Sequence, residues 1–80
     1  MGKITIEADG AKIKLKEKEI FMKKPKVKDL KNVDHVKSDE DREIELFANL
    51  TQIPKDELEE FYLDEYSLLQ EAYLKLTTNA

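Results

Sequence analysis

Hydrophobic and polar residues alternate with a period of two at the start of the chain. The hydrophobic members of the alternation are Ile4, Ile6, Ala8, Ile13 and Leu15. This pattern is typical of strands with one buried face, and Asp9-Gly10 between the two runs supplies the positive φ angles of a tight turn, which predicts a β-hairpin. The residues predicted to face the core occupy odd positions just before residues 17–19 and even positions just after them. A bulge or a second turn would produce this shift. A third strand is expected around residues 19–24.

Pro25 ends this third strand because proline lacks a backbone N–H. The stretch from Lys26 to Val33 suits a short helix, since Val27 and Leu30 are three residues apart. We expect a polar connection from there to Lys37.

From Ser38 onward, hydrophobic residues recur with the period of a helix. Ser38 is followed three residues later by Asp41, which is a capping-box-like start for a helix over about 39–51. The hydrophobic residues of this helix spread over about 200°, so we expect other elements to cover both of its flanks. Pro54 suits the first position of a next helix, and Asp64 is predicted to cap the last helix, over about 65–77.

The two periodicities predict an α+β fold, in which an N-terminal β-hairpin or short meander is followed by about three α-helices. Within a single domain of residues 1–80, we expect strands over 1–24, a short helix and linker over 25–37, and helices over 38–80. A chain of 80 residues can form only a thin hydrophobic core, which self-association would supplement. We therefore expect a homo-oligomer at micromolar concentration.

The charge balance changes abruptly along the chain. Residues 1–37 hold 11 Lys against six acids, and residues 38–80 hold three bases against twelve acids, so the halves carry +5 and −9. Such halves can attract one another within one molecule or head to tail between molecules.

A basic-hairpin binding module for nucleic acid or another protein is the alternative function. It would use the lysines of the hairpin, which are Lys12, Lys14, Lys16 and Lys18. Alternating lysines also protect an exposed strand from edge-to-edge aggregation. Nucleic acid is not the favoured partner, because a charge run is more often a solvated face and Arg42 is the sole arginine.

Residues that carry chemistry are few. The chain has no cysteine and a single histidine, His35, which has no partner at metal-ligand spacing. Ser38 and Ser67 have no histidine at a sequence-evident distance. We therefore expect no enzyme, no cofactor and no metal. No hydrophobic run approaches the roughly 18 residues of a membrane span, and the start lacks a signal peptide, so we expect a cytoplasmic protein without a membrane partner.

Hydrophobic groups beyond the needs of a small core are the candidates for a binding site. Leu74 falls beside Ser67 and Gln70, on the side of the last helix opposite its hydrophobic arc. Tyr62 and Tyr66 belong to a surplus of aromatic residues in the helical half. We hypothesise that Tyr62, Tyr66 and Leu74 contact a second copy or a client protein. The alternative is that Leu74 packs on the hairpin or is a surface leucine without a partner.

Several short motifs follow one another in an order known from one family. They are Thr5 to Leu15 with its Asp-Gly turn, Phe21 to Leu30 with Pro25 and the Asp29-Leu30 pair, Leu46 to Pro54, and Leu58 to Ala72. Together they resemble, over nearly the whole chain, the small tail assembly chaperones of Mu-type and related contractile-tailed phages. Gln52 stands where that family has the glycine of a Thr-Gly-Ile-Pro turn.

The resemblance implies a non-enzymatic phage or prophage protein. Such a protein binds the long tape-measure protein and keeps it soluble until tail-tube subunits polymerise around it. The resemblance further implies self-association, action in the host cell cytoplasm and absence from the mature virion.

Overall fold

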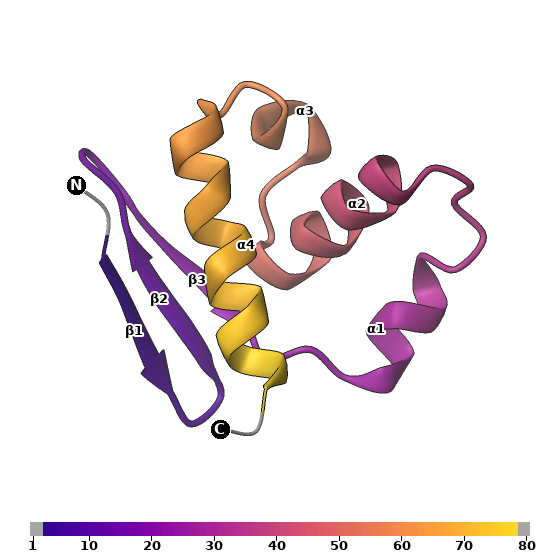
Figure 1. Cartoon of the computed structure of the whole chain (residues 1–80), viewed down its shortest axis with the longest axis horizontal. Helices are drawn as coiled ribbons and strands as arrows, with labels where there is room; N and C mark the ends of the chain where they lie inside the picture. The colour runs from indigo at the N-terminus through magenta and orange to yellow at the C-terminus, as the bar shows by residue number, and fades with distance from the viewer. Residues whose placement is uncertain (1–2, 79–80) are drawn as a thin grey trace.

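The computed structural model describes residues 3–78, in which three strands are followed by four helices (Figure 1). The strands are β1 (Lys3–Glu7), β2 (Gly10–Lys14) and β3 (Glu19–Lys23). The helices are α1 (Val27–Asn32), α2 (Asp39–Thr51), α3 (Lys55–Leu58) and α4 (Leu63–Thr77). This order confirms the predicted α+β class.

The sheet is an antiparallel meander in the order β1-β2-β3. Its register places Ile4, Ile13 and Ile20 in one row and Ile6, Ala11 and Met22 in another. Both rows lie on one face, because side chains alternate between the faces along a strand. α4 packs against all three strands and α2 packs against β3, so the helices cover one face of the sheet (Figure 1).

The predicted change of phase between β2 and β3 comes from a second turn. The N–H of Leu15 donates to the carbonyl of Lys18 at 2.8 Å and closes this turn. Ile13 and Ile20 are thereby brought opposite each other, although one position is odd and the other even.

Gly10 is required for space, whereas the sequence suggested that it supplies a positive φ angle. Ala8 and Asp9 form the first turn, and Gly10 already belongs to β2 without a positive φ. The prediction of positive φ angles at Asp9-Gly10 is therefore wrong. A Cβ at Gly10 would overlap the carbonyl oxygen of Met22 and lie 2.6 Å from the ring of Phe21. Gly10 thus permits the close approach of β3.

The core lies between the sheet and the helices, with Phe47 of α2 at its centre. The largest fully buried side chains are Phe47, Ile13, Met22, Leu50 and Leu69. The ring of Phe47 lies 5.6 Å from that of Tyr66 and 5.5 Å from that of Tyr73, both on α4. Because α2 also packs against β3, α1 and α3, its wide hydrophobic arc is covered on both flanks, as predicted.

The starts of the two long helices differ in how well local rules predict them. α2 begins as expected, with the N–H of Asp41 donating to Ser38 Oγ at 3.4 Å. α4 begins two residues earlier than predicted. Its N-cap is Tyr62, whose N–H donates to the carboxylate of Glu65 at 3.0 Å. The prediction of Asp64 as the cap is wrong, and Leu63 is the first residue of the helix.

Gln52 ends α2 in the left-handed conformation, with φ 62° and ψ 26°. Glycine adopts this conformation without the steric cost that a Cβ brings. We therefore expect Gln52→Gly to raise the free energy of unfolding by about 0.5–1 kcal/mol and the melting temperature by about 2–8 °C. Thermal unfolding measures the change. Asn49→Gly, at an exposed helical position of α2, is the control and should be destabilising. An unchanged or lower melting temperature for Gln52→Gly would contradict the expectation.

Candidate protein-binding surface

The three predicted binding residues do not form one patch. Tyr62 and Leu74 are 77% and 64% exposed, whereas Tyr66 is partly buried against the core. Tyr62 and Leu74 lie at opposite ends of α4, about 18 Å apart at a rise of 1.5 Å per residue. The exposure of Leu74 agrees with its place on the helical wheel and excludes its burial against the hairpin.

Tyr66 connects α4 to α2. Its hydroxyl donates to Glu43 Oε1 at 2.9 Å, and the side-chain amide of Gln70 donates to the same oxygen at 3.0 Å. Burial raises the pKa of Tyr66 well above its ordinary value, and the hydrogen bond to Glu43 and the negative charge of Glu43 raise it further. Tyr66 therefore holds the two long helices in place within this chain.

The raised pKa of Tyr66 predicts a loss of stability at alkaline pH. In the unfolded chain the hydroxyl loses its proton near pH 10, whereas the folded chain retains it to higher pH. The stabilisation is therefore fully present below about pH 10 and is lost progressively as the pH rises above that value. We expect the free energy of unfolding to fall more steeply between about pH 10 and 11.5 for wild type than for Tyr66→Phe.

Urea denaturation across this pH range measures the two slopes. Tyr66→Phe keeps the ring against Phe47 and removes only the ionisable hydroxyl. The control Tyr62→Phe changes an exposed tyrosine and should keep the wild-type slope. Parallel curves for wild type and Tyr66→Phe would contradict the assignment.

Five exposed and uncharged side chains follow one side of α4. They recur at helical spacing and fall within about 80° of the helix circumference. These residues, which we call the α4 stripe, are Leu63, Ser67, Gln70, Leu74 and Thr77. Charged residues make up 40% of the chain, so an uncharged strip along a whole helix is a distinct feature of its surface.

The polar members of the α4 stripe already have hydrogen-bond partners within the molecule. Ser67 Oγ donates to the carbonyl of Leu63 at 2.9 Å, and Thr77 Oγ1 donates to that of Tyr73 at 2.9 Å. The amide of Gln70 donates to Glu43. Covering the stripe with an apolar surface therefore leaves these donors satisfied and desolvates no charge on the stripe itself.

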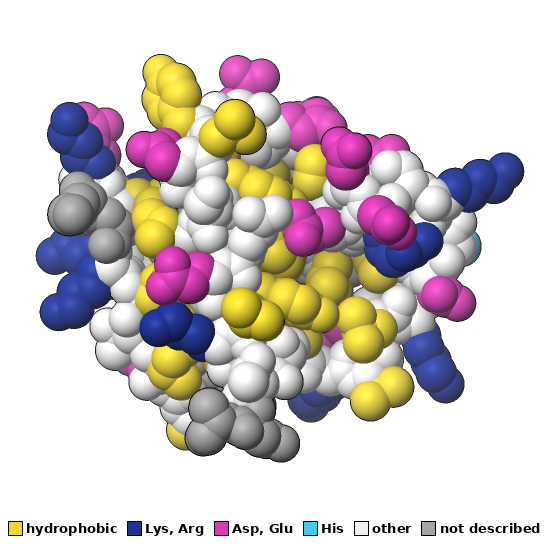
Figure 2. All heavy atoms as spheres, in the orientation of Figure 1, with side chains coloured by type: hydrophobic (Ala, Val, Ile, Leu, Met, Phe, Trp, Pro, Cys, Tyr) yellow, Lys and Arg dark blue, Asp and Glu magenta, His cyan; other side chains and the backbone are white. Residues whose placement is uncertain are grey.

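A hollow lies beside each end of α4. The larger, of about 920 Å³, lies between the β2–β3 turn and the start of α4 and is lined by Leu15, Lys16, Glu17, Lys18, Tyr62, Asp64, Glu65 and Leu68. The smaller, of about 200 Å³, lies between α1, α2 and α4, and its apolar lining residues are Leu30, Val33, Leu46, Phe47 and Tyr73. Figure 2 shows hydrophobic side chains gathered over the lower half of α4 and from there toward α1. None of the five residues of the α4 stripe lines either hollow.

Leu63 is the exposed residue that sequence reasoning missed. At 86% it is more exposed than Tyr62 or Leu74. Because the sequence placed the cap at Asp64, Leu63 fell outside the expected helix. The spacing of Leu63, Ser67, Gln70 and Leu74 was the signal that could have found it.

The residues that can carry chemistry are dispersed. His35 is exposed in the connection between α1 and α2. Across residues 3–78, no group of three or more His, Cys, Asp or Glu side chains is arranged to hold a metal ion. None of the helices in this part of the chain is long and apolar enough to cross a membrane. The α4 stripe is thus a candidate surface for protein contact.

Comparison with known proteins identifies the family. The chain matches, over residues 3–77, the family described as phage tail assembly chaperone proteins, E, or 41 or 14. The match includes the sheet, the four helices and the whole α4 stripe. Searches of curated proteins and of solved structures gave no match. Since the family match covers nearly the whole chain, this protein belongs to the phage tail assembly chaperone family.

Proposed function

We propose that this chain binds the tape-measure protein of a contractile-tailed phage or prophage and keeps it soluble until tail-tube subunits polymerise around it. Membership of the tail assembly chaperone family supports a role in tail assembly. In this role the protein is non-catalytic, uses no cofactor, acts in the host cell cytoplasm and is absent from the mature virion.

The α4 stripe is the observation that carries the proposal. A client helix whose apolar residues recur every three or four positions can lie along such a stripe. Leu63 and Leu74 are about 16 Å apart along the axis of α4, so they contact different turns of the client.

The three predicted site residues take different parts in this proposal. Leu74, together with Leu63, contacts the client directly. Tyr62 forms part of the wall of the larger hollow. Tyr66 acts through its bond to Glu43, which positions α4 against α2.

Coverage of a long client requires more than one copy. One α4 stripe covers only about 21 Å of a helix. We therefore propose that the chain works as a homo-oligomer, in which the many acids of residues 38–80 remain outside and keep the assembly soluble.

Co-expression with the tape-measure protein tests this function. Wild type is expected to raise the soluble fraction of the tape-measure protein. Leu74→Asp places a charge in the apolar contact and should weaken binding by about tenfold or more, because burial of an unpaired charge is costly. Its effect on the fold should stay within about 0.5 kcal/mol, since Leu74 is exposed.

Val27→Asp is the matched control. Val27 is 72% exposed at the start of α1 and is not a member of the α4 stripe, so the same kind of replacement there should leave the rescue intact. Equal rescue by wild type and Leu74→Asp would remove Leu74 from the site. Absence of rescue by wild type would overturn the proposed function.

A further inference from the structure

Within residues 3–78 no ion pair joins the basic half of the chain to the acidic half, although Lys16 and Lys18 line one hollow together with Asp64 and Glu65. Every ion pair in residues 3–78 joins two residues of the same half. The pairs are Lys12–Glu7, Lys23–Asp29, Arg42–Asp39 and Lys75–Glu71. Lys18 does reach the second half, but its Nζ lies 4.2 Å from the ring centre of Phe61. The strand lysines and the acids of α3 thus form no ion pair with each other within one molecule, and contact between molecules can join them.

The positive surface is the open face of the sheet. The strand register places its exposed lysines on the side opposite the core, and we call Lys3, Lys12, Lys14 and Lys23 the lysine face. Glu7 and Glu19 lie on the same side, but the four lysines outnumber these two acids, so the net charge of this face is positive. Lys3 and Lys14 stand directly opposite each other. Glu19 stands opposite Lys14 on the other neighbouring strand and offsets part of this repulsion.

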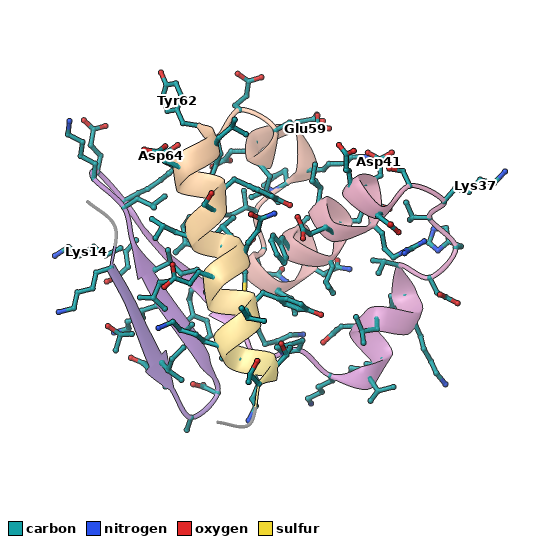
Figure 3. The ribbon with its side chains drawn as sticks, viewed as in Figure 1. Lys14, Lys37, Asp41, Glu59, Tyr62 and Asp64 are labelled. Carbon is teal, nitrogen blue, oxygen red and sulfur yellow. The ribbon has the colours of Figure 1, made fainter. Side chains whose placement is uncertain are left out.

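The negative surface is at α3. Four exposed acids occupy α3 and the residues just after it, and we call Asp56, Glu57, Glu59 and Glu60 the acidic edge. In Figure 3, Glu59 lies along the top of the molecule, whereas Lys14 projects from the sheet at the left. The two surfaces thus point in different directions, and one molecule cannot bring its own pair together.

We propose that copies of the chain associate head to tail, with the lysine face of one copy against the acidic edge of the next. Such a contact joins two different surfaces, so it extends into an open row unless the rotation between copies closes a ring. The α4 stripe belongs to neither surface and stays exposed to a client in every copy. The use of this row on a client rests on the proposed function, but the association itself needs no client.

The contact depends on exposed charges and is therefore sensitive to salt. Exposed charges are screened beyond about 10 Å at 0.1 M ionic strength, and beyond about 4 Å at 0.5 M. The average mass of the wild-type protein is expected to rise with concentration at low salt and to return to the monomer value of 9.3 kDa in 0.5 M NaCl.

Charge reversal on each surface separately tests the proposal by sedimentation equilibrium. Lys3→Glu/Lys14→Glu makes the sheet face negative, and Glu57→Lys/Glu59→Lys/Glu60→Lys makes the edge positive. Each variant alone then carries two surfaces of like sign and should remain a monomer at low salt. An equimolar mixture has complementary contacts at every junction and should regain the wild-type average mass. Circular dichroism checks that both variants keep the wild-type fold.

Several results would overturn the proposal. They are a monomeric wild type at low salt, self-association of either variant to the wild-type extent, and failure of the mixture to associate. Binding of the lysine face to labelled single-stranded DNA, with loss in Lys3→Glu/Lys14→Glu while the association of copies is unaffected, would assign this face to nucleic acid instead. A wild type that remains monomeric yet keeps the tape-measure protein soluble would remove the interface and the proposed homo-oligomer, and would leave the proposed chaperone function standing.

Discussion

Replacing Phe47 by Ala is expected to lower the free energy of unfolding by about 3–5 kcal/mol. Phe47 is fully buried, and its ring contacts Tyr66 and Tyr73 of α4. The substitution removes the apolar contacts and leaves a cavity between α2 and α4. A domain of 80 residues has a total stability of about 4–12 kcal/mol, so this single change removes a large share of it.

Urea unfolding followed by circular dichroism measures the loss at Phe47. Phe21→Ala is the matched control, because it is the same replacement at a residue that is 40% exposed on the open face of the sheet. Its loss should be clearly smaller. A loss below about 1 kcal/mol for Phe47→Ala, or an equal loss at Phe21, would contradict the central place of Phe47 in the core.

Gly10→Ala is expected to lower the free energy of unfolding by about 2–3 kcal/mol. The added Cβ overlaps the carbonyl oxygen of Met22 and lies 2.6 Å from the ring of Phe21. A backbone atom cannot rotate away as a side chain can, so β2 and β3 must move apart and weaken their ladder. In an open turn, by contrast, the same replacement would be nearly neutral.

The same unfolding assay distinguishes these two situations at Gly10. Lys12→Ala, two residues further along β2 and exposed, is the control and should change stability by about 0.5 kcal/mol or less. Amide exchange should also quicken in β3 of the Gly10→Ala variant, since its ladder is the one displaced. Wild-type stability in Gly10→Ala would show that the strands have room for the methyl group.

The elements of the fold were predictable because their hydrophobic periods are regular. Alternation before Pro25 and helical spacing after Ser38 indicate which side of each strand or helix is buried, and the structure follows both patterns. The change of phase between Ile13 and Ile20 likewise required a turn or bulge, and a turn is present.

Local rules failed at the first turn of the sheet and at the start of α4. Asp9-Gly10 resembles a turn pair, but the constraint on Gly10 comes from β3, which lies opposite it in the sheet. Asp64 is a common capping residue, yet Glu65 binds the N–H of Tyr62 and starts the helix earlier.

The candidate site was predictable in part for the same reason. Leu74 is exposed as its position on the helical wheel indicates. Tyr66 was counted as surplus because its partner Glu43 lies 23 residues earlier, on another helix. Leu63 was missed because the helix start was placed after it. Periodicity thus indicates which side of a helix is apolar, while partners across the core become visible only in three dimensions.

Photo-crosslinking most directly tests whether the tape-measure protein lies on the α4 stripe. A photoreactive phenylalanine derivative replaces Ser67, within the stripe, or Thr5, on the open face of the sheet. Each variant is co-expressed with the tape-measure protein and irradiated. We expect an adduct with the tape-measure protein from position 67 and none from position 5. A tape-measure adduct from position 5 with none from position 67 would contradict the assignment of the α4 stripe as the client-binding surface.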